Sequence, residues 1–142
     1  MNAQEWTLIE HFKSVEFDSP DAPGSGFVEM HWRFLSKLDS LRDDWGKPMT
    51  INSGFRTAAH NAKCGGKPNS AHLRGYAADI RTKDLRDAIA LAIKAAGHGF
   101  ERIGVDLHGR YVHLDVDDSL PVATWFYNLP DTEAQMTLAQ GA

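Results

Sequence analysis

Two histidines and one aspartate have the types and the order expected of a metal site. The stretch SAHLRGYAADI (residues 70–80) places His72 and Asp79 seven positions apart with Gly75 between them, and YVHLDVD further along carries His113. Two imidazoles and one carboxylate would supply three ligands and leave a fourth position open, the pattern of a catalytic rather than a structural zinc. A loop that leads into a buried strand explains the His72–Asp79 spacing equally well, so spacing alone leaves both interpretations open.

The strands predicted around these residues would turn them to one face of a sheet. In YVHLDVD, Val112 and Leu114 alternate with His113 and Asp115, so one side is apolar and the other carries the histidine and acids. The same alternation in GYAADI puts Asp79 in a segment that otherwise reads as buried. A buried carboxylate requires a charge partner or a metal. The exposed face of a half-buried sheet is the alternative for the His113 strand.

Apolar residues at three- and four-residue steps predict two helices. The first spans 28–45 and ends before Gly46. The second is capped by Thr82 or Asp84 and ends near Gly97. Its predicted apolar face is formed by Leu85, Ile89, Ile93 and Ala96.

Four short segments predict strands, and no linker or internal repeat divides the chain. They are MTINSGF, GYAADIRT, ERIGVDL and RYVHLDVD, with a hairpin turn at His108–Gly109 joining the last two. From Pro121 we expect one apolar cluster, Trp125-Phe126-Tyr127, followed by a polar end that frays. The pattern predicts a single α+β domain over 1–142, with its core over about 12–130.

Composition excludes several classes of protein. The 142 residues carry a net charge of -4, whereas a protein that binds nucleic acid usually carries a positive charge. The single cysteine, Cys64, excludes an internal disulfide and a Cys-rich metal cluster. No stretch has the length that spans a bilayer. The opening MNAQEWTLIEHFKS has no apolar run typical of a signal peptide, so we expect synthesis in the cytoplasm.

The motifs together resemble a known family. S-x-H-x-x-G-x-A-x-D, present in full over residues 70–79, resembles the signature of the M15 zinc peptidases, which are D-Ala-D-Ala carboxypeptidases and L-alanyl-D-glutamate endopeptidases of the Hedgehog/DD-peptidase fold. NSGFR is similar to the family's S-G-[YF]-R turn, and VHLDV to its V-H-[VL]-D-V strand. EHFKSVEFDSPDAPGSG resembles the start of the short, single-domain branch common in phages and bacteria. The likeness runs from about Phe12 to Asp117 and implies a small antiparallel sheet with flanking helices.

The resemblance also implies roles for individual residues. It implies Zn²⁺ held by His72, Asp79 and His113. It implies that Arg56 holds a substrate carboxylate, a role that suits the planar guanidinium fork. Ser70 would supply a hydroxyl near the metal, although a plain turn residue is nearly as good an explanation.

The sequence departs from the family three residues before the last zinc histidine, where many members carry a general base. That position is Arg110 here. We expect Asp115 to serve as the base instead, because it shares a strand face with His113, and Asp106 is the second choice. His108 matches an additional active-site histidine of some relatives and would stabilise the oxyanion; a hairpin-tip residue without a catalytic role is the alternative.

The resemblance therefore implies a zinc peptidase that cleaves peptidoglycan stem peptides at an L-Ala-D-Glu or a D-Ala-D-Ala bond. We expect a monomeric phage or prophage endolysin that reaches the cell wall after release by a partner such as a holin, without membrane insertion. The alternative, which the Arg110 departure motivates, is a catalytically silent, zinc-stabilised wall-binding or structural module.

Overall fold

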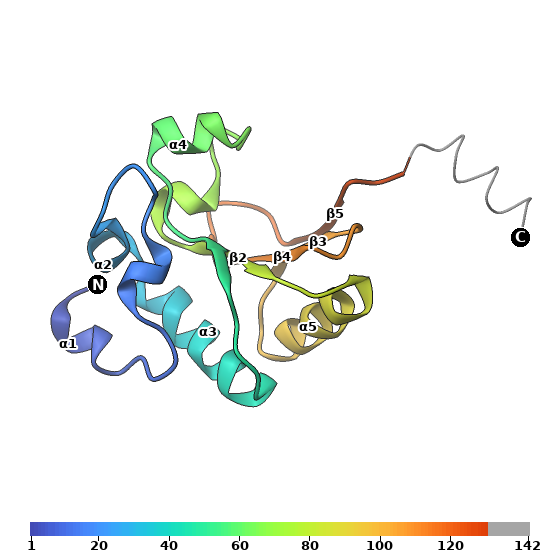
Figure 1. Ribbon diagram of the computed structural model, residues 1–142, viewed down its shortest axis with the longest axis horizontal. Helices are drawn as coiled ribbons and strands as arrows, with labels where there is room; N and C mark the ends of the chain where they lie inside the picture. Colours follow the sequence, from blue (N-terminus) through green and yellow to red (C-terminus); the bar gives the residue numbers. More distant parts are fainter. Residues whose placement is uncertain (131–142) are drawn as a thin grey trace, which may run out of the picture.

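A mixed five-stranded sheet in the order β1-β2-β4-β3-β5 organises the molecule (Figure 1). The computed structural model describes residues 1–130. The helical elements are α1 (Ala3–Trp6), η1 (Ser14–Phe17), α2 (Ser25–Glu29), α3 (Trp32–Trp45), α4 (Ala58–Lys63), η2 (Ala71–Arg74) and α5 (Leu85–Gly97), where η marks a 3-10 helix. The strands are β1 (Ile51–Ser53), β2 (Ala77–Arg81), β3 (Arg102–Asp106), β4 (Tyr111–Asp115) and β5 (Ala123–Tyr127). The predicted α+β class is confirmed, but the sheet is mixed rather than antiparallel as expected, because β5 runs parallel to β3.

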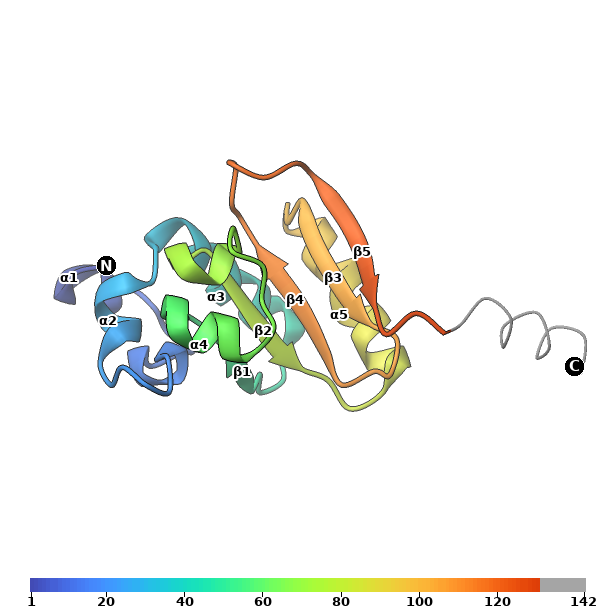
Figure 2. The same cartoon turned by 90° about the horizontal axis from the view of Figure 1, so that it is seen from above.

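The two faces of the sheet are covered differently. In Figure 1, α3 and α5 lie on one side of the strands and α4 on the other, and the view from above in Figure 2 shows α5 running beneath β3 and β4. The hydrophobic core lies between the sheet and helices α3 and α5, and it includes Phe34, Leu38, Ile80 and Leu114. The predicted alternation holds, because Ile80 and Leu114 face this core while Asp79 and His113 face the opposite side.

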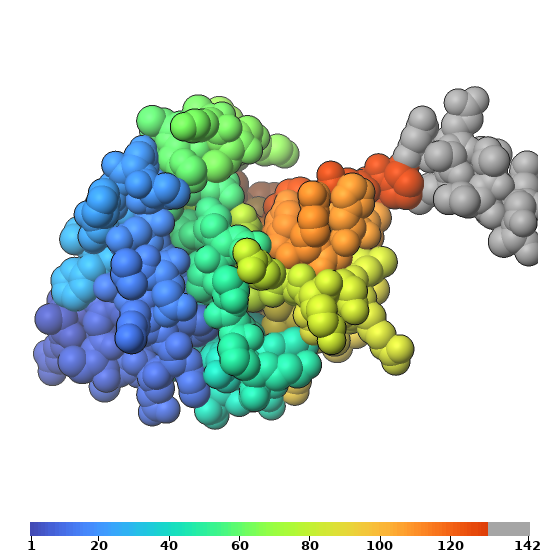
Figure 3. Space-filling view, viewed as in Figure 1, coloured from blue at the N-terminus to red at the C-terminus, as the bar shows by residue number. Residues whose placement is uncertain are grey.

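The N-terminal third forms one side of the molecule. In the space-filling view its blue segments form this side, and the yellow and orange segments of α5, β3 and β4 form the other (Figure 3). Within residues 1–130, no helix combines the length and apolar character needed to cross a bilayer.

The first predicted helix is two helices in the structure. Met30 is buried with an extended backbone, and α3 begins only at Trp32 because the His31 ring accepts a hydrogen bond from the Arg33 N–H (3.2 Å). A side-chain acceptor of this kind stabilises a helix start. The predicted end at Gly46 is confirmed, with φ at 70°.

The predicted apolar face of α5 is wrong. The buried side chains are Ala88, Leu91 and Ala95, whereas Ile89 and Ile93 are 46% and 69% exposed. Small alanine side chains let the helix lie close to β3 and β4, which leaves the larger isoleucines on the outside. The helix has apolar residues on more than one face, so its periodicity does not identify the face that meets the sheet.

The sequence pattern does not predict strand β5. It runs parallel to β3, from Arg102↔Ala123 to Asp106↔Tyr127, and forms one edge of the sheet. The predicted Trp125-Phe126-Tyr127 cluster is therefore the end of a strand. The predicted fraying of the chain end falls on residues 131–142, outside the described residues.

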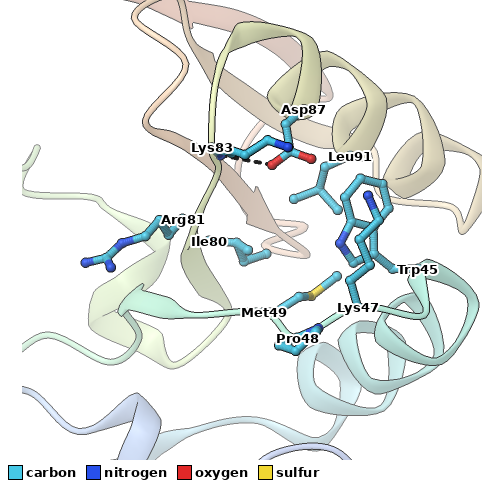
Figure 4. A pocket seen from close by; sticks show the side chains of 9 residues that line it. All are labelled: Trp45, Lys47, Pro48, Met49, Ile80, Arg81, Lys83, Asp87 and Leu91. Atoms are coloured by element: carbon cyan, nitrogen blue, oxygen red, sulfur yellow. Dashed lines mark hydrogen bonds between the residues drawn. The ribbon is translucent and has the colours of Figure 1, made fainter.

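A surface hollow of about 160 Å³ lies on the α3 and α5 side of the sheet (Figure 4). Trp45, Met49, Ile80 and Leu91 contribute apolar side chains to it, and Lys83 lies at its rim with its N–H donating to Asp87 (2.9 Å). None of the predicted site residues lines this hollow.

Gly75 explains the glycine in the 70–79 motif. It ends η2 in the left-handed region with φ at 70°, and a Cβ placed there would lie 1.9 Å from the carbonyl oxygen of Glu29. Its own carbonyl accepts a hydrogen bond from the His31 N–H (3.0 Å). Only glycine satisfies both the backbone angle and the close approach.

We predict that Gly75→Ala lowers the free energy of unfolding by at least about 2 kcal/mol more than Gly46→Ala. Gly46 also has φ at 70°, but no atom lies within 4 Å of the position that a methyl group would take there, so it isolates the cost of the backbone angle. Urea unfolding of both variants measures the difference. An equal loss of stability in both variants would mean that the backbone near Glu29 moves aside at no cost in free energy.

Asp106 closes the β3–β4 hairpin. Its fully buried carboxylate accepts hydrogen bonds from the N–H groups of His108 (3.1 Å) and Arg110 (3.2 Å), from Arg110 Nε (2.9 Å) and from Asn128 Nδ2 (2.6 Å). Burial raises the pKa of Asp106, but hydrogen bonds from Arg110, Asn128 and the backbone outweigh it and lower the pKa to about 2. These partners make Asp106 a structural acid, which does not fit its place as second choice for the general base.

This shift predicts a loss of stability in acid. Because the folded pKa lies below the value near 3.9 of an unfolded aspartate, the stabilisation is complete above about pH 4 and is lost as the pH falls toward 2. The stability difference between the wild type and Asp106→Asn should shrink by about 1 kcal/mol between pH 6 and pH 3. Urea unfolding at both pH values measures it, and a constant difference would contradict the depressed pKa.

Candidate metal centre

The candidate site lies on one row of residues that crosses the whole sheet. The strand registers pair Ser53 with Asp79, Asp79 with His113, His113 with Gly104, and Gly104 with Trp125. We call these five residues the site row. All of them face the side of α4, opposite the core, so strand pairing alone brings Asp79 and His113 together.

His72 reaches the row from η2, outside the sheet. The Ser70 hydroxyl accepts a hydrogen bond from the His72 N–H (3.3 Å) at the start of η2, and Gly75 then turns the chain into β2. His72 Nδ1 lies 2.6 Å from the carbonyl oxygen of Gly54. Since a carbonyl only accepts, Nδ1 carries the proton and Nε2 is left with its lone pair.

His113 is oriented by acids on both sides of its ring. Nε2 lies 2.7 Å from Asp115 Oδ2, and Nδ1 lies 2.9 Å from Asp79 Oδ1. Asp79 Oδ1 is also 3.3 Å from His72 Nε2. The ring thus turns Nδ1 toward Asp79 and His72 and Nε2 away from them.

Three ligand atoms converge at this point. His72, Asp79 and His113 each offer one ligand atom within 4.8 Å of the others. His72 Nε2 is buried and has no hydrogen-bond partner among the described residues. A buried lone pair that faces a carboxylate is unfavourable unless a cation lies between them. Two imidazole nitrogens and one carboxylate oxygen form a donor set that zinc accepts, so the residues fit the predicted ion.

The electrostatics of the cluster favour a positive charge. Burial lowers the pKa of His113, but hydrogen bonds with Asp115 and Asp79 outweigh it and raise the pKa to about 9. Burial opposes the charged form of Asp79, yet the neighbouring His72 and His113 hold its pKa well below its usual range. Burial lowers the pKa of His72, which keeps its ring neutral. His72 and Asp79 are thus in the states that bind metals, whereas His113 would release its Nδ1 proton when a metal binds.

Arg56 lies at the β1 end of the site row. Its Nη2 donates to Asp79 Oδ2 (2.9 Å), its Nε to Ser53 Oγ (2.8 Å) and its Nη1 to Asn61 Oδ1 (3.3 Å). The bond from Nη2 holds the carboxylate of Asp79 from the side away from the histidines, and the other two bonds fix the guanidinium. One N–H on Nη1 and one on Nη2 are not used by these bonds.

The position of Asp115 suits a residue that orients His113 better than it suits a general base. Its Oδ1 accepts hydrogen bonds from Arg102 Nε (2.8 Å) and from the Asp117 N–H (3.1 Å), while its Oδ2 contacts His113 Nε2. Its side chain is fully buried. The carboxylate therefore contacts the ring nitrogen that points away from Asp79 and His72, which does not fit the expected role of proton acceptor beside the metal.

Three further sequence predictions concern Ser70, His108 and Arg110. The Ser70 hydroxyl caps η2, which places it next to His72 along the chain. His108 is exposed in the hairpin, and its backbone N–H donates a hydrogen bond to Asp106. Its ring is not part of the cluster formed by the three ligand residues. Arg110 is bound to Asp106. The roles of Ser70 and His108 in substrate binding stay predictions.

Sequence reasoning missed three residues at this site: Gly104, Trp125 and Arg102. The Trp125 ring lies 5.3 Å from the His113 ring, between centroids, and the Arg102 guanidinium lies 5.0 Å from the Trp125 ring centroid. The available signal is a glycine inside a strand, which often marks close approach of another group. Only the pairing of β5 with β3 shows which group approaches Gly104.

Comparisons with known proteins agree with this geometry. A curated relative, the zinc D-Ala-D-Ala carboxypeptidase of Streptomyces albus G, is 39% identical over 82 residues, which cover 55% of this chain and 32% of that protein. The match thus spans about a third of the relative. The family model described as Peptidase M15 matches residues 10–115, a range that contains the three ligand residues. The chain belongs to the peptidase M15 family, as its motifs predicted.

Proposed function

We propose that the chain is a zinc-dependent peptidase that hydrolyses stem peptides of peptidoglycan. The observation that carries the proposal is the convergence of His72 Nε2, Asp79 Oδ1 and His113 Nδ1 within a chain of the M15 family. The name of the Streptomyces relative supports a D-Ala-D-Ala bond as one substrate. An L-Ala-D-Glu bond is the other class that the motifs imply.

His72, Asp79 and His113 would hold the ion. Zinc supplies Lewis-acid chemistry, which polarises a scissile carbonyl and activates water. The protein holds each ligand from its far side: the Gly54 carbonyl fixes His72, Asp115 fixes His113, and Arg56 fixes Asp79. Such outer partners set the tautomer and the direction of metal ligands.

Arg56 would also orient the substrate. The free N–H groups on Nη1 and Nη2 would hold the carboxylate of the residue on the amine side of the scissile bond. Hydrolysis adds one water across the amide: the oxygen and one proton go to the acyl carbon as a carboxylic acid, and the other proton goes to the leaving amine. Orientation by Arg56 makes this attack effectively intramolecular.

A role in cell lysis is the finer part of the proposal. The resemblance to the short M15 branch supports a phage or prophage endolysin, made in the cytoplasm and released to the wall by a partner such as a holin. The protein would act as a monomer on the stem peptide.

A second candidate function is a zinc-stabilised wall-binding or structural module without activity. Arg110 stands where many family members carry the base, and the carboxylates of Asp106 and Asp115 are both bound to other groups. The second candidate therefore rests on the lack of an assigned base.

The first prediction from the proposed function concerns digestion of purified peptidoglycan. The zinc-loaded protein should release products that a chelator abolishes and added zinc restores, because the ligand cluster requires its ion. Mass spectrometry of the products identifies the bond. New L-Ala carboxyl ends indicate an endopeptidase, and loss of one terminal D-Ala indicates a carboxypeptidase.

His72→Ala is the control, since it removes the ligand whose Nε2 has no other partner among the described residues. Absence of products from several wall types, with a full zinc site, would overturn the peptidase and support the binding module.

The second prediction separates the two roles of Asp115. If Asp115 orients His113, Asp115→Asn should weaken zinc binding by about 10- to 100-fold while activity returns at saturating zinc. If Asp115 is the base, zinc affinity should change little and activity should stay lost at saturating zinc. Competition with a fluorescent chelator measures the affinity.

Asp118→Asn is the matched control for this experiment. Asp118 lies three residues further along, 80% exposed, and pairs with Arg33 rather than with the site. Its zinc affinity and activity should equal those of the wild type.

A further inference from the structure

The β5 end of the site row carries an aromatic wall, formed by Trp125 and Tyr127. The Trp125 ring lies 5.3 Å from that of His113 and 6.1 Å from that of Tyr127, between centroids. Tyr127 in turn lies 5.2 Å from Tyr111. These rings lie on the same sheet face as the metal ligands, so a substrate over the ligands must contact them or pass beside them.

Gly104 is the reason that the wall reaches His113. A Cβ at Gly104 would lie 2.7 Å from Trp125 Nε1 and 2.6 Å from Tyr127 Cε2. The space above β3 that a side chain would occupy is therefore filled by these two rings. A glycine inside a strand weakens the sheet, and close approach of another group is a physical reason for it.

Trp125 is held in place before any substrate binds. The Arg102 guanidinium lies 5.0 Å from its ring centroid, within the range of a cation–π interaction. Arg102 is itself fixed by Asp115 and by the carbonyl of Pro121. A ring fixed in this way can exclude a large group instead of moving aside for it.

The two ends of the row give a substrate its direction. Arg56 contacts Ser53 at the β1 end, Trp125 lies at the β5 end, and the ligands lie between them. If Arg56 holds the carboxylate on the amine side of the scissile bond, the residue on the acyl side falls toward Trp125. Both bond classes of the proposed function, L-Ala-D-Glu and D-Ala-D-Ala, have alanine on the acyl side.

We propose that Trp125 determines specificity for the acyl-side residue, with its indole packing against an alanyl methyl group and excluding larger side chains. This inference rests on the proposed function, since it needs a cleaved amide bond. It does not depend on which of the two bonds is cut, because the acyl-side residue is alanine in both.

The test compares paired substrates that differ only on the acyl side. The probes are diacetyl-L-Lys-D-Ala-D-Ala against its D-Val-D-Ala analogue, and an L-Ala-D-Glu peptide against its L-Val-D-Glu analogue. In the wild type, kcat/KM should favour alanine. In Trp125→Ala the ratio of alanine to valine should fall by about 10-fold or more, because extra methyl groups in a packed site change kcat/KM by at least that much.

Phe126→Ala is the matched control, since Phe126 is the next residue on β5, half-exposed and directed to the opposite face. The ratio of kcat/KM for the alanine substrate to that for the valine substrate should be the same in Phe126→Ala as in the wild type. Trp125→Phe should give an intermediate ratio, and it carries the test if Trp125→Ala loses its fold or its zinc, as circular dichroism and metal content will show.

The failures of the two proposals are distinguishable. An active wild type whose ratio is unchanged in both Trp125 variants overturns the specificity role and leaves the peptidase intact, because a merely structural role lowers kcat/KM for both substrates equally. A zinc-loaded wild type that cleaves none of the probes and no peptidoglycan overturns the proposed function, and the specificity role with it.

Discussion

The mutual approach of three potential ligand atoms, His72 Nε2, Asp79 Oδ1 and His113 Nδ1, is the constraint on which this structure depends. The buried Asp79 carboxylate needs a compensating positive charge, which the raised pKa of His113 supplies as a proton and which a bound cation would supply in its place. The surrounding bonds enforce that arrangement. Each histidine is held by its outer nitrogen, and Asp79 by the oxygen that faces Arg56, so the inner atoms are aimed at one point.

The sheet supplies the precision for this arrangement. Asp79 and His113 are direct cross-strand partners, and neighbouring strands hold such partners at a fixed short distance. His72 comes from outside the sheet, and its position depends on the close passage of Gly75 beside the Glu29 carbonyl. Glycine thus appears at two places where the site needs backbone or aromatic rings to approach closely: Gly75 beside α2, and Gly104 beneath Trp125.

Two aspartates on neighbouring strands illustrate how partners decide a role. Asp106 and Asp115 are both fully buried and both pair with an arginine. Asp106 uses its hydrogen bonds to close the hairpin, whereas Asp115 joins Arg102 to His113 and so connects the metal ligand to the residue that holds Trp125. Because Asp115 and Arg102 are both largely buried, removing one of them would leave the charge of the other without compensation. The ligand cluster and the aromatic wall are therefore parts of one hydrogen-bonded and packed unit.

The sequence by itself determined the features that depend on local pattern. Alternation in GYAADI and YVHLDVD identified the faces of β2 and β4, and the motif residues identified the family and its ligand set. Tertiary structure decided the rest. The face of α5 that meets the sheet is set by close packing of Ala88 and Ala95, which periodicity cannot distinguish when several faces of a helix are apolar. The partner of Gly104 is known only once β5 pairs with β3. Which nitrogen of His113 faces the other ligands depends on Asp115, and a shared strand face does not reveal whether a carboxylate lies in front of a ring or behind it. The first two depend on contacts between segments distant in sequence, and the third depends on the fixing of Asp115 by Arg102 from β3. A local pattern carries no information about these contacts.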